Sequence, residues 1–301
     1  MKDRTKKISI AILAVVMGLA QSVTAQSFKK IKVAKNAPLV QVASGGASVW
    51  ALASNGNPYR FNGKSFALAN TISLSQIAVG GGNAAQADEV WGLNSSGSIY
   101  RASKSGTSWI FTQVPGSFTG IVVGPGYQDA CHPYEVWGLN SGSAIFRYNY
   151  CNNSFDQVPG ILCDIQVGGS DVWGAQCGPN TFRFDFTTGT FFPISSPFTG
   201  FPALTVGPTG EVWAIDTGSS NRLYRFDVFR RAFDALGSGT TRVQAGGDGV
   251  WVLVGNEILR WQASDFGFRQ VTGSLSSISV GSGGGVWGIN SSHQVFAFST
   301  P

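Results

Sequence analysis

Charged side chains are scarce in this sequence, and histidine is almost absent. Asp, Glu, Lys and Arg make up 12% of the 301 residues, and His132 and His293 are the 2 histidines. The sequence contains no Cys-x-x-Cys pair, no His-Glu-x-x-His segment, no phosphate-binding glycine loop and no Gly-x-Ser-x-Gly elbow. Because metal sites and the common catalytic devices need those patterns, we predict no metal, no cofactor and no enzymatic activity. A pair of carboxylates from distant parts of the chain is the catalytic alternative that stays open.

Long hydrophobic runs are also lacking, except for one near the N-terminus. Four basic residues precede an apolar run over 8–19, and Val23-Thr24-Ala25 offers small residues for cleavage. A run of about twelve apolar residues is too short to cross a bilayer. We therefore predict that residues 1–25 form a signal peptide and that residues 26–301 are exported, to the periplasm or the medium, without spanning the membrane. The basic residues of the exported part are scattered, which gives no support for nucleic-acid binding.

The sequence does contain an internal repeat. The dipeptide Val-Trp occurs seven times, at intervals of 36 to 46 residues. A unit of about 40 residues cannot bury its own apolar face, so successive units must pack on one another. The seven tryptophans are Trp50, Trp91, Trp137, Trp173, Trp213, Trp251 and Trp287.

Each repeat has the pattern of four short strands. In the copy that starts at Gln76, segments 76–80, 89–94, 98–101 and 111–116 are rich in β-branched and aromatic residues, and Gly, Ser, Asn or Pro separates them. Four strands in about 40 residues are typical of β-propeller blades. The sequence therefore predicts an all-β propeller of four-stranded antiparallel blades, with seven blades in one domain over the exported chain.

The two ends of the chain complement each other. The last copy ends after its third strand, at 294–298, and residues 28–33 resemble the missing fourth strand. We predict that this N-terminal strand completes the final blade, so that Ile31 lies near Val295 and the ring is closed. A closed ring leaves no open sheet edge that could aggregate.

Four cysteines remain, and an even number in an exported protein indicates disulfides. Asp129-Ala130-Cys131-His132 could be taken for metal ligands, but the spacings of metal sites are absent. In a four-stranded meander the first and third turns lie on one rim, and the second turn and the inter-blade connections lie on the other. The blade arrangement therefore pairs Cys131 with Cys151 and Cys163 with Cys177.

The repeat resembles the tectonin repeat. The shared features are an inner strand ending in Val-Gly, Val-Trp-Gly/Ala-Leu-Asn, a Ser/Gly turn, Ile-Tyr-Arg and a closing Val-Pro-Gly, best seen over 89–114 and 135–158. The resemblance covers nearly the whole exported chain and implies a β-propeller. Several tectonin proteins are lectins for cell-surface glycans, including lipopolysaccharide, so the resemblance also implies carbohydrate binding. Six blades are common in that family, and seven would be a departure.

Three repeated side-chain types are the candidate ligand contacts. A tryptophan either packs between blades, which we favour for any single one, or offers a flat face to a sugar ring. The Asn that ends a second strand either caps a turn or hydrogen-bonds sugar hydroxyls. The third-strand Arg lies opposite Val-Trp and contacts the indole, the acid before Val, or a ligand. The candidate carbohydrate-binding residues are Trp91, Asn94, Arg101, Trp137, Asn140, Arg147, Trp287 and Asn290.

Together these features predict a secreted, lectin-like protein. Its expected partners are glycans or lipopolysaccharide on cell surfaces, bound at several weak and repeated sites whose strength comes from multivalency. The alternative is a secreted scaffold that binds a protein partner and has no catalytic activity.

Overall fold

The computed structural model describes residues 27–82, 86–169 and 171–299. The predicted signal peptide, residues 1–25, lies outside these ranges. No helix in the described ranges is long and apolar enough to cross a membrane.

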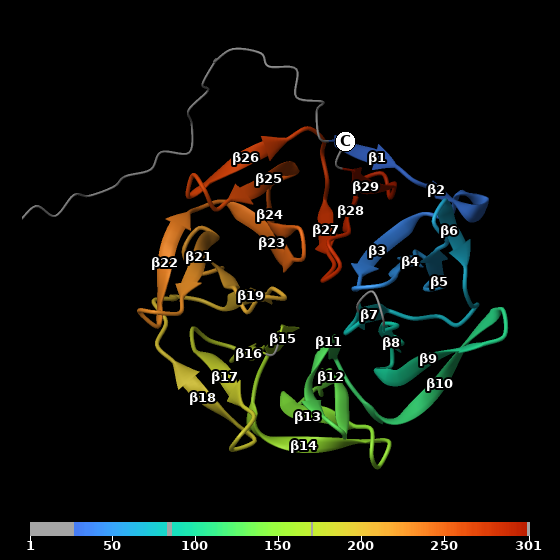
Figure 1. Ribbon diagram of the computed structural model, residues 1–301, viewed down its shortest axis with the longest axis horizontal. Coiled ribbons are helices and arrows are strands. Elements are labelled where there is room, and N and C mark those ends of the chain that lie inside the picture. The colour runs from blue at the N-terminus through green and yellow to red at the C-terminus, as the bar shows by residue number, and fades with distance from the viewer. Residues whose placement is uncertain (1–26, 83–85, 170, 300–301) are drawn as a thin grey trace, which may run out of the picture.

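Seven sheets, each with four consecutive antiparallel strands, are arranged as blades around a central channel (Figure 1). This confirms the predicted seven-bladed propeller. The first strand of each blade lines the channel, and the fourth lies at the outer edge. The described chain has one short 3-10 helix, η1 (Ala34–Asn36), which precedes blade 1.

The strands follow one another in sequence order within each blade. Blade 1 contains β3 (Leu39–Ser44), β4 (Val49–Ala53), β5 (Pro58–Phe61) and β6 (Ser65–Leu68); blade 2 contains β7 (Gln76–Gly80), β8 (Glu89–Leu93), β9 (Ser98–Ser105) and β10 (Ser108–Ser117); blade 3 contains β11 (Gly120–Asp129), β12 (His132–Leu139), β13 (Ala144–Asn149) and β14 (Ser154–Ile161). Blade 4 contains β15 (Asp164–Gly168), β16 (Asp171–Ala175), β17 (Thr181–Asp185) and β18 (Thr190–Ile194); blade 5 contains β19 (Pro202–Val206), β20 (Val212–Asp216), β21 (Arg222–Asp227) and β22 (Ala232–Gly237). Blade 6 contains β23 (Thr240–Gly246), β24 (Gly249–Val254), β25 (Glu257–Gln262) and β26 (Gly267–Val271); blade 7 contains β27 (Ser277–Val280), β28 (Val286–Ile289) and β29 (Val295–Ser299).

The N-terminal segment closes the ring, as predicted. Strand β1 (Ser27–Lys30) pairs with β29 as the fourth strand of blade 7, and the Ile31 N–H donates to the Val295 carbonyl oxygen at 2.9 Å. The structure also refines the prediction of one strand over 28–33. The segment divides at Ile31, and β2 (Lys32–Val33) pairs in parallel with β6 as a fifth strand of blade 1. The closing segment therefore joins the last blade to the first.

The repeated tryptophan of each second strand packs against an aromatic ring of the following blade. The indole centroid of Trp137 lies 4.8 Å from Phe184, and that of Trp213 lies 5.1 Å from Trp261, both edge to face. In six blades this partner directly follows the third-strand Arg or Ala297 in sequence. In blade 2 that place is held by Ala102, and Trp109 of the fourth strand packs on Trp50 instead, at 4.7 Å. Such edge-to-face pairs stabilise the joints beyond simple burial.

Glycine at the end of the inner strand allows neighbouring blades to approach closely. A Cβ at Gly80 would overlap the carbonyl oxygen of Val123, and one at Gly168 would overlap that of Val206. Because backbone atoms cannot move aside as a flexible side chain can, these positions exclude larger residues. The Val-Gly ending of the repeat therefore has a packing cause.

We expect Gly168→Ala to lower the free energy of unfolding by about 2 kcal/mol, because the added methyl group overpacks a joint between blades. Gly120→Ala is the matched control, since nothing lies within 4 Å of a Cβ there. Urea denaturation of both variants measures the difference. Equal stabilities for the two variants would show that blade spacing does not depend on this glycine.

The two disulfides join the predicted pairs of cysteines. Cys131–Cys151 links the first and third turns of blade 3, with the Cα atoms 5.0 Å apart. Cys163–Cys177 lies on the opposite rim, with the Cα atoms 5.2 Å apart, and links the connection before β15 to the loop after β16. We call the rim that carries the second-to-third-strand loops and the inter-blade connections the hairpin rim.

Candidate carbohydrate-binding site

The repeated tryptophans are core residues. Trp91 and Trp137 have 0% of their surface exposed, and Trp287 has 7%. Their rings are covered by aromatic side chains of the next blade, such as Tyr148 over Trp91 at 4.7 Å. A sugar ring cannot stack on a covered face, so the stacking role considered for these three residues does not fit the structure, and packing accounts for them.

The third-strand arginine lies directly opposite the tryptophan in every blade that has one. Trp91 pairs with Arg101 and Trp137 with Arg147 in the strand register. The sequence left open whether this Arg contacts the indole or the acid before Val, and the structure shows both. Arg147 lies 5.5 Å from the Trp137 ring centroid and forms a salt bridge with Glu135. Arg101 likewise lies over the Trp91 ring and forms a salt bridge with Glu89, at 2.8 Å from the carboxylate.

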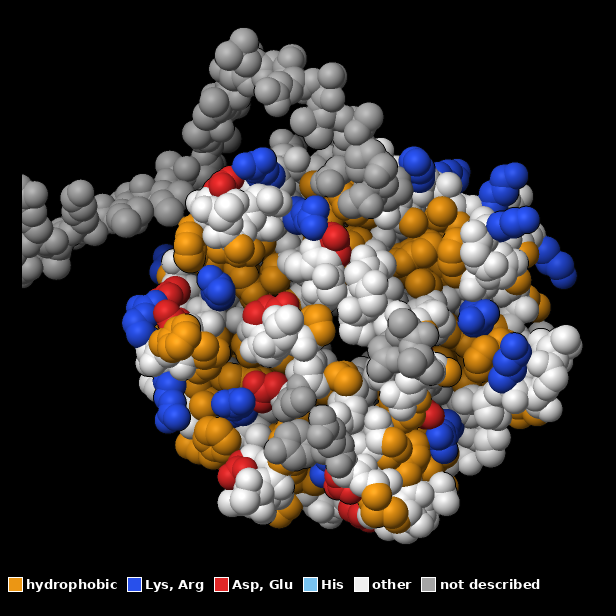
Figure 2. Space-filling view, viewed as in Figure 1, with side chains coloured by type: hydrophobic (Ala, Val, Ile, Leu, Met, Phe, Trp, Pro, Cys, Tyr) orange, Lys and Arg blue, Asp and Glu red, His pale blue; other side chains and the backbone are white. Residues whose placement is uncertain are grey.

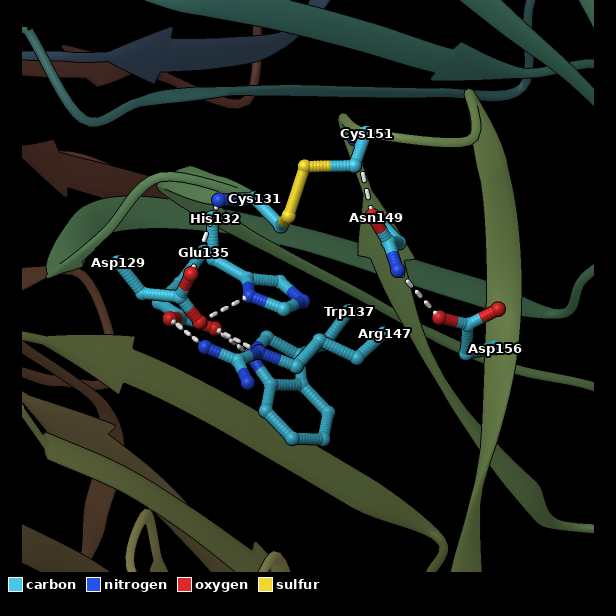
Figure 3. A network of polar contacts seen from close by, with 9 residues as sticks. All are labelled: Asp129, Cys131, His132, Glu135, Trp137, Arg147, Asn149, Cys151 and Asp156. Atoms are coloured by element: carbon cyan, nitrogen blue, oxygen red, sulfur yellow. Dashed lines mark hydrogen bonds and ion pairs between the residues drawn. A yellow bond between two sulfur atoms is a disulfide. The ribbon is translucent and has the colours of Figure 1, made fainter.

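Figure 3 shows this network in blade 3. Glu135 accepts hydrogen bonds from Trp137 Nε1 at 2.7 Å and from Arg147 Nε at 2.8 Å. Close by, Asp129 Oδ2 lies 2.6 Å from His132 Nδ1, and Cys131 is held in its disulfide. The N–H of Cys131 and the His132 ring together lower the pKa of Asp129. The four-residue segment over 129–132 thus forms a cross-linked turn.

The asparagines that end the second strands lie on the hairpin rim, away from the arginines. Asn94 Oδ1 accepts the N–H groups of Ser96 and Ser98, at 3.0 and 2.8 Å. Asn140 and Asn290 repeat this pattern with the residues two and four positions further on. Asp216, the residue in the same place of blade 5, accepts N–H groups from Thr199, Gly200 and Gly218.

The structure therefore separates the three residue types that the sequence grouped. In blades 2 and 3 the second strand runs from the acid paired with Arg at one rim to the Asn at the other, and the tryptophan lies buried between them. Each of these asparagines caps its turn with its side-chain oxygen, Oδ1. The Nδ2 groups of Asn94 and Asn140 donate to no other described residue, and so remain available to a ligand.

A groove of about 860 Å³ lies on the hairpin rim between blades 2 and 3. The Asn94 loop forms one side, and the connection from β10 to β11 with Ser141 forms the other. Ser95, Ser96 and Ser141 are exposed, and their hydroxyl groups make no hydrogen bond within the described part of the chain. The lining contains no charged side chain and consists of Gln41, Ser75, Gln76, Leu93, Asn94, Ser95, Ser96, Gly97, Ser117, Phe118, Thr119, Gly120 and Ser141.

Sequence reasoning named Asn94 but missed the serines and Thr119 around it. The signal was present, because Asn-Ser-Ser recurs at Asn94 and Asn290, and Asn-Ser-Gly occurs at Asn140. The sequence does not show that the loop of one blade faces the connection to the next blade, because that proximity arises from the packing of the blades.

Comparisons with known proteins agree with this architecture. The protein resembles, in fold alone, YCF48 bound to D1 peptide, with a TM-score of 0.65 at 12% identity over 91% of this chain and 97% of that chain. It also resembles the Neurospora crassa Pan2 WD40 domain, with a TM-score of 0.63 at 12% identity over 89% and 90% of the two chains. A third similar structure is the extracellular domain of a putative hybrid two-component system, BT3049, from B. thetaiotaomicron, with a TM-score of 0.65 at 11% identity over 92% of this chain and 42% of that chain.

No curated protein matches the sequence. The model of the tectonin domain matches residues 14–192 and 201–300, which is nearly the whole chain. This match agrees with the resemblance that the repeat indicates. The protein belongs to the tectonin family.

Proposed function

We propose that this protein is a secreted lectin that binds cell-surface carbohydrate, including lipopolysaccharide, through grooves on its hairpin rim. The observation that supports this most directly is the chemistry of the groove between blades 2 and 3. Its lining combines the free hydroxyl groups of Ser95, Ser96 and Ser141 with the amide N–H donor of Asn94. Sugars present many hydroxyl groups, and uncharged donors and acceptors match them.

Repetition of the loop supports multivalent binding. The loops after β8, β12 and β28 share the same Asn-capped geometry. Several weak sites on one rigid ring raise the overall avidity for a surface that displays many copies of a glycan. Secretion would place these sites where such surfaces occur. The protein would then act without catalysis.

Asn94→Asp tests the groove without removing its turn. The Asp oxygen can still accept the N–H groups of Ser96 and Ser98, but the Nδ2 donor is replaced by an acceptor. We expect glycan affinity to fall by about tenfold, the loss of one good hydrogen bond to a ligand. A glycan array identifies the ligand, and titration calorimetry measures the loss.

Asn62→Asp is the matched control, because Asn62 caps the turn after β5 through its Oδ1 and lies outside the groove. Unchanged glycan affinity in Asn94→Asp, with the fold intact, would contradict this site. An array without sugar-class selectivity, combined with recovery of a specific protein partner in pull-downs, would instead support the scaffold alternative.

A further inference from the structure

The closing sector of the ring is basic and holds no acidic residue, whereas acidic residues outnumber basic ones in the rest of the exported chain. Residues 27–87 contain no Asp or Glu, and neither do residues 266–301. All acidic residues other than Asp3 lie between Asp88 and Asp265. The closing sector comprises blade 1, β1, β2 and blade 7. Its basic residues are Lys29, Lys30, Lys32, Lys35, Arg60 and Lys64.

The lysines of this sector are exposed and have no acidic partners. In the described part of the chain, the ion pairs all use Arg or His132. Lys30, Lys32 and Lys64 are exposed, and β2 pairs Lys32 with Ser65, which places Lys64 beside it. Figure 2 shows Lys and Arg side chains along the edge of the disc over β1, β2 and β6.

A groove of about 590 Å³ lies among these lysines, on the hairpin rim at the closure of the ring. It occupies the same structural place as the neutral groove, because a second-to-third-strand loop faces the connection to the next blade in both. Here the loop carries Ser292, His293 and Gln294, and the connection carries Lys30, Lys32 and Asn36. The two equivalent grooves therefore differ chiefly in charge.

We propose that the closure groove binds an acidic polysaccharide, with its carboxylates at Lys30 and Lys32 and its hydroxyl groups at Ser292, Gln294 and Asn36. This inference rests on the proposed sugar-binding function and assigns a ligand class to a second site. Lysine is a compact, flexible cation that can follow carboxylates along a polymer chain. The unpaired charge also attracts the polymer over a distance that salt shortens.

The surface chemistry favours a polysaccharide over a membrane. Stable peripheral membrane binding combines basic side chains with apolar groups that enter the interface. Among the described residues of the closing sector, the exposed large apolar side chains are Val40 and Leu68, and only Leu68 lies on β6 beside the lysines. The lysine-lined groove itself has no Phe, Tyr or Trp in its lining.

Binding of oligomeric polygalacturonate to the full chain tests the proposal, with its methyl ester as the uncharged form of the same polymer. We expect the acid form to bind, its affinity to fall with added salt, and the ester to bind at least tenfold more weakly. Lys30→Gln/Lys32→Gln should lower the affinity for the acid about tenfold, the loss expected for two exposed ion pairs. The control Lys104→Gln/Arg222→Gln removes the same charge from exposed positions in blades 2 and 5.

Three results would overturn the proposal: equal losses in the two double variants with unchanged thermal unfolding, equal binding of the acid and the ester, or tighter binding to vesicles of anionic lipid than to the polymer. Binding of neutral glycans without binding of polygalacturonate would overturn this inference alone. Failure to bind either class would overturn the proposed function as well.

Discussion

Glu135→Ala is expected to lower the free energy of unfolding by about 3–5 kcal/mol, the usual loss when one partner of a buried ion pair is removed. Only 1% of the Glu135 surface is exposed. The substitution leaves the Arg147 guanidinium, whose side chain is 13% exposed, between aromatic rings without a counter-charge. It also leaves the Nε1 donor of Trp137 buried without an acceptor. Urea denaturation followed by tryptophan fluorescence measures the change.

Glu211→Ala is the matched control at the same position of blade 5. Glu211 accepts hydrogen bonds from Thr209 and forms no salt bridge within the described residues. Its neighbour Trp213 already has a buried Nε1 group without a partner. We expect a loss below about 1 kcal/mol, as for other surface substitutions. Similar losses in both variants would show that the acid before Val stabilises blades by some means other than the Arg and Trp contacts.

Asp164→Asn is expected to stabilise the protein at neutral pH by up to about 3 kcal/mol. Burial raises the pKa of Asp164 to about 6, against the hydrogen bonds that favour its charged form. Because each pKa unit corresponds to about 1.4 kcal/mol, keeping this carboxylate ionised opposes folding. In blades 1 and 2 the same place is held by Gln41 and Gln76, whose neutral amides bond the backbone of the next inner strand.

The sign of the pH dependence follows from this raised pKa. Between about pH 4 and pH 6 the folded chain holds a proton on Asp164 that the unfolded chain has released, so the native protein loses stability as pH rises. Asp164→Asn removes this loss. The difference in the free energy of unfolding between the variant and the original protein should therefore grow over that pH range and then level off. Thermal unfolding at a series of pH values measures it. A difference independent of pH would mean that Asp164 does not titrate in this range.

Asp216→Asn provides a contrast of opposite sign. Burial raises the pKa of Asp216, but the N–H groups of Thr199, Gly200 and Gly218 outweigh it and hold the pKa below its ordinary value. The stabilisation from this carboxylate is present above about pH 4 and is lost as pH falls through the lowered pKa. Asp216→Asn should therefore destabilise the protein at neutral pH, whereas Asp164→Asn stabilises it.

Part of the candidate site could be predicted from sequence, and part could not. The Asn that ends three of the second strands and the Arg of six third strands stand out because they repeat in phase. Their roles differ because strand pairing places the Arg against the Trp and the acid, whereas the Asn ends its strand at the other rim. The serines of the groove repeat beside these asparagines, but the repeat did not identify them as ligand contacts, since serine is also common in turns that bind no ligand.

The sequence by itself determined the seven blades, the ring closed by the N-terminal segment and the pairing of the cysteines. These follow from the period of the repeat, from turn residues and from chain order, all of which are local or linear properties. Only the tertiary structure decided that the tryptophans are covered, that Ala102 is compensated by Trp109, and that two equivalent grooves differ in charge. Each of these depends on which side chains meet across a joint between blades, and that contact is set by packing between segments far apart in the chain.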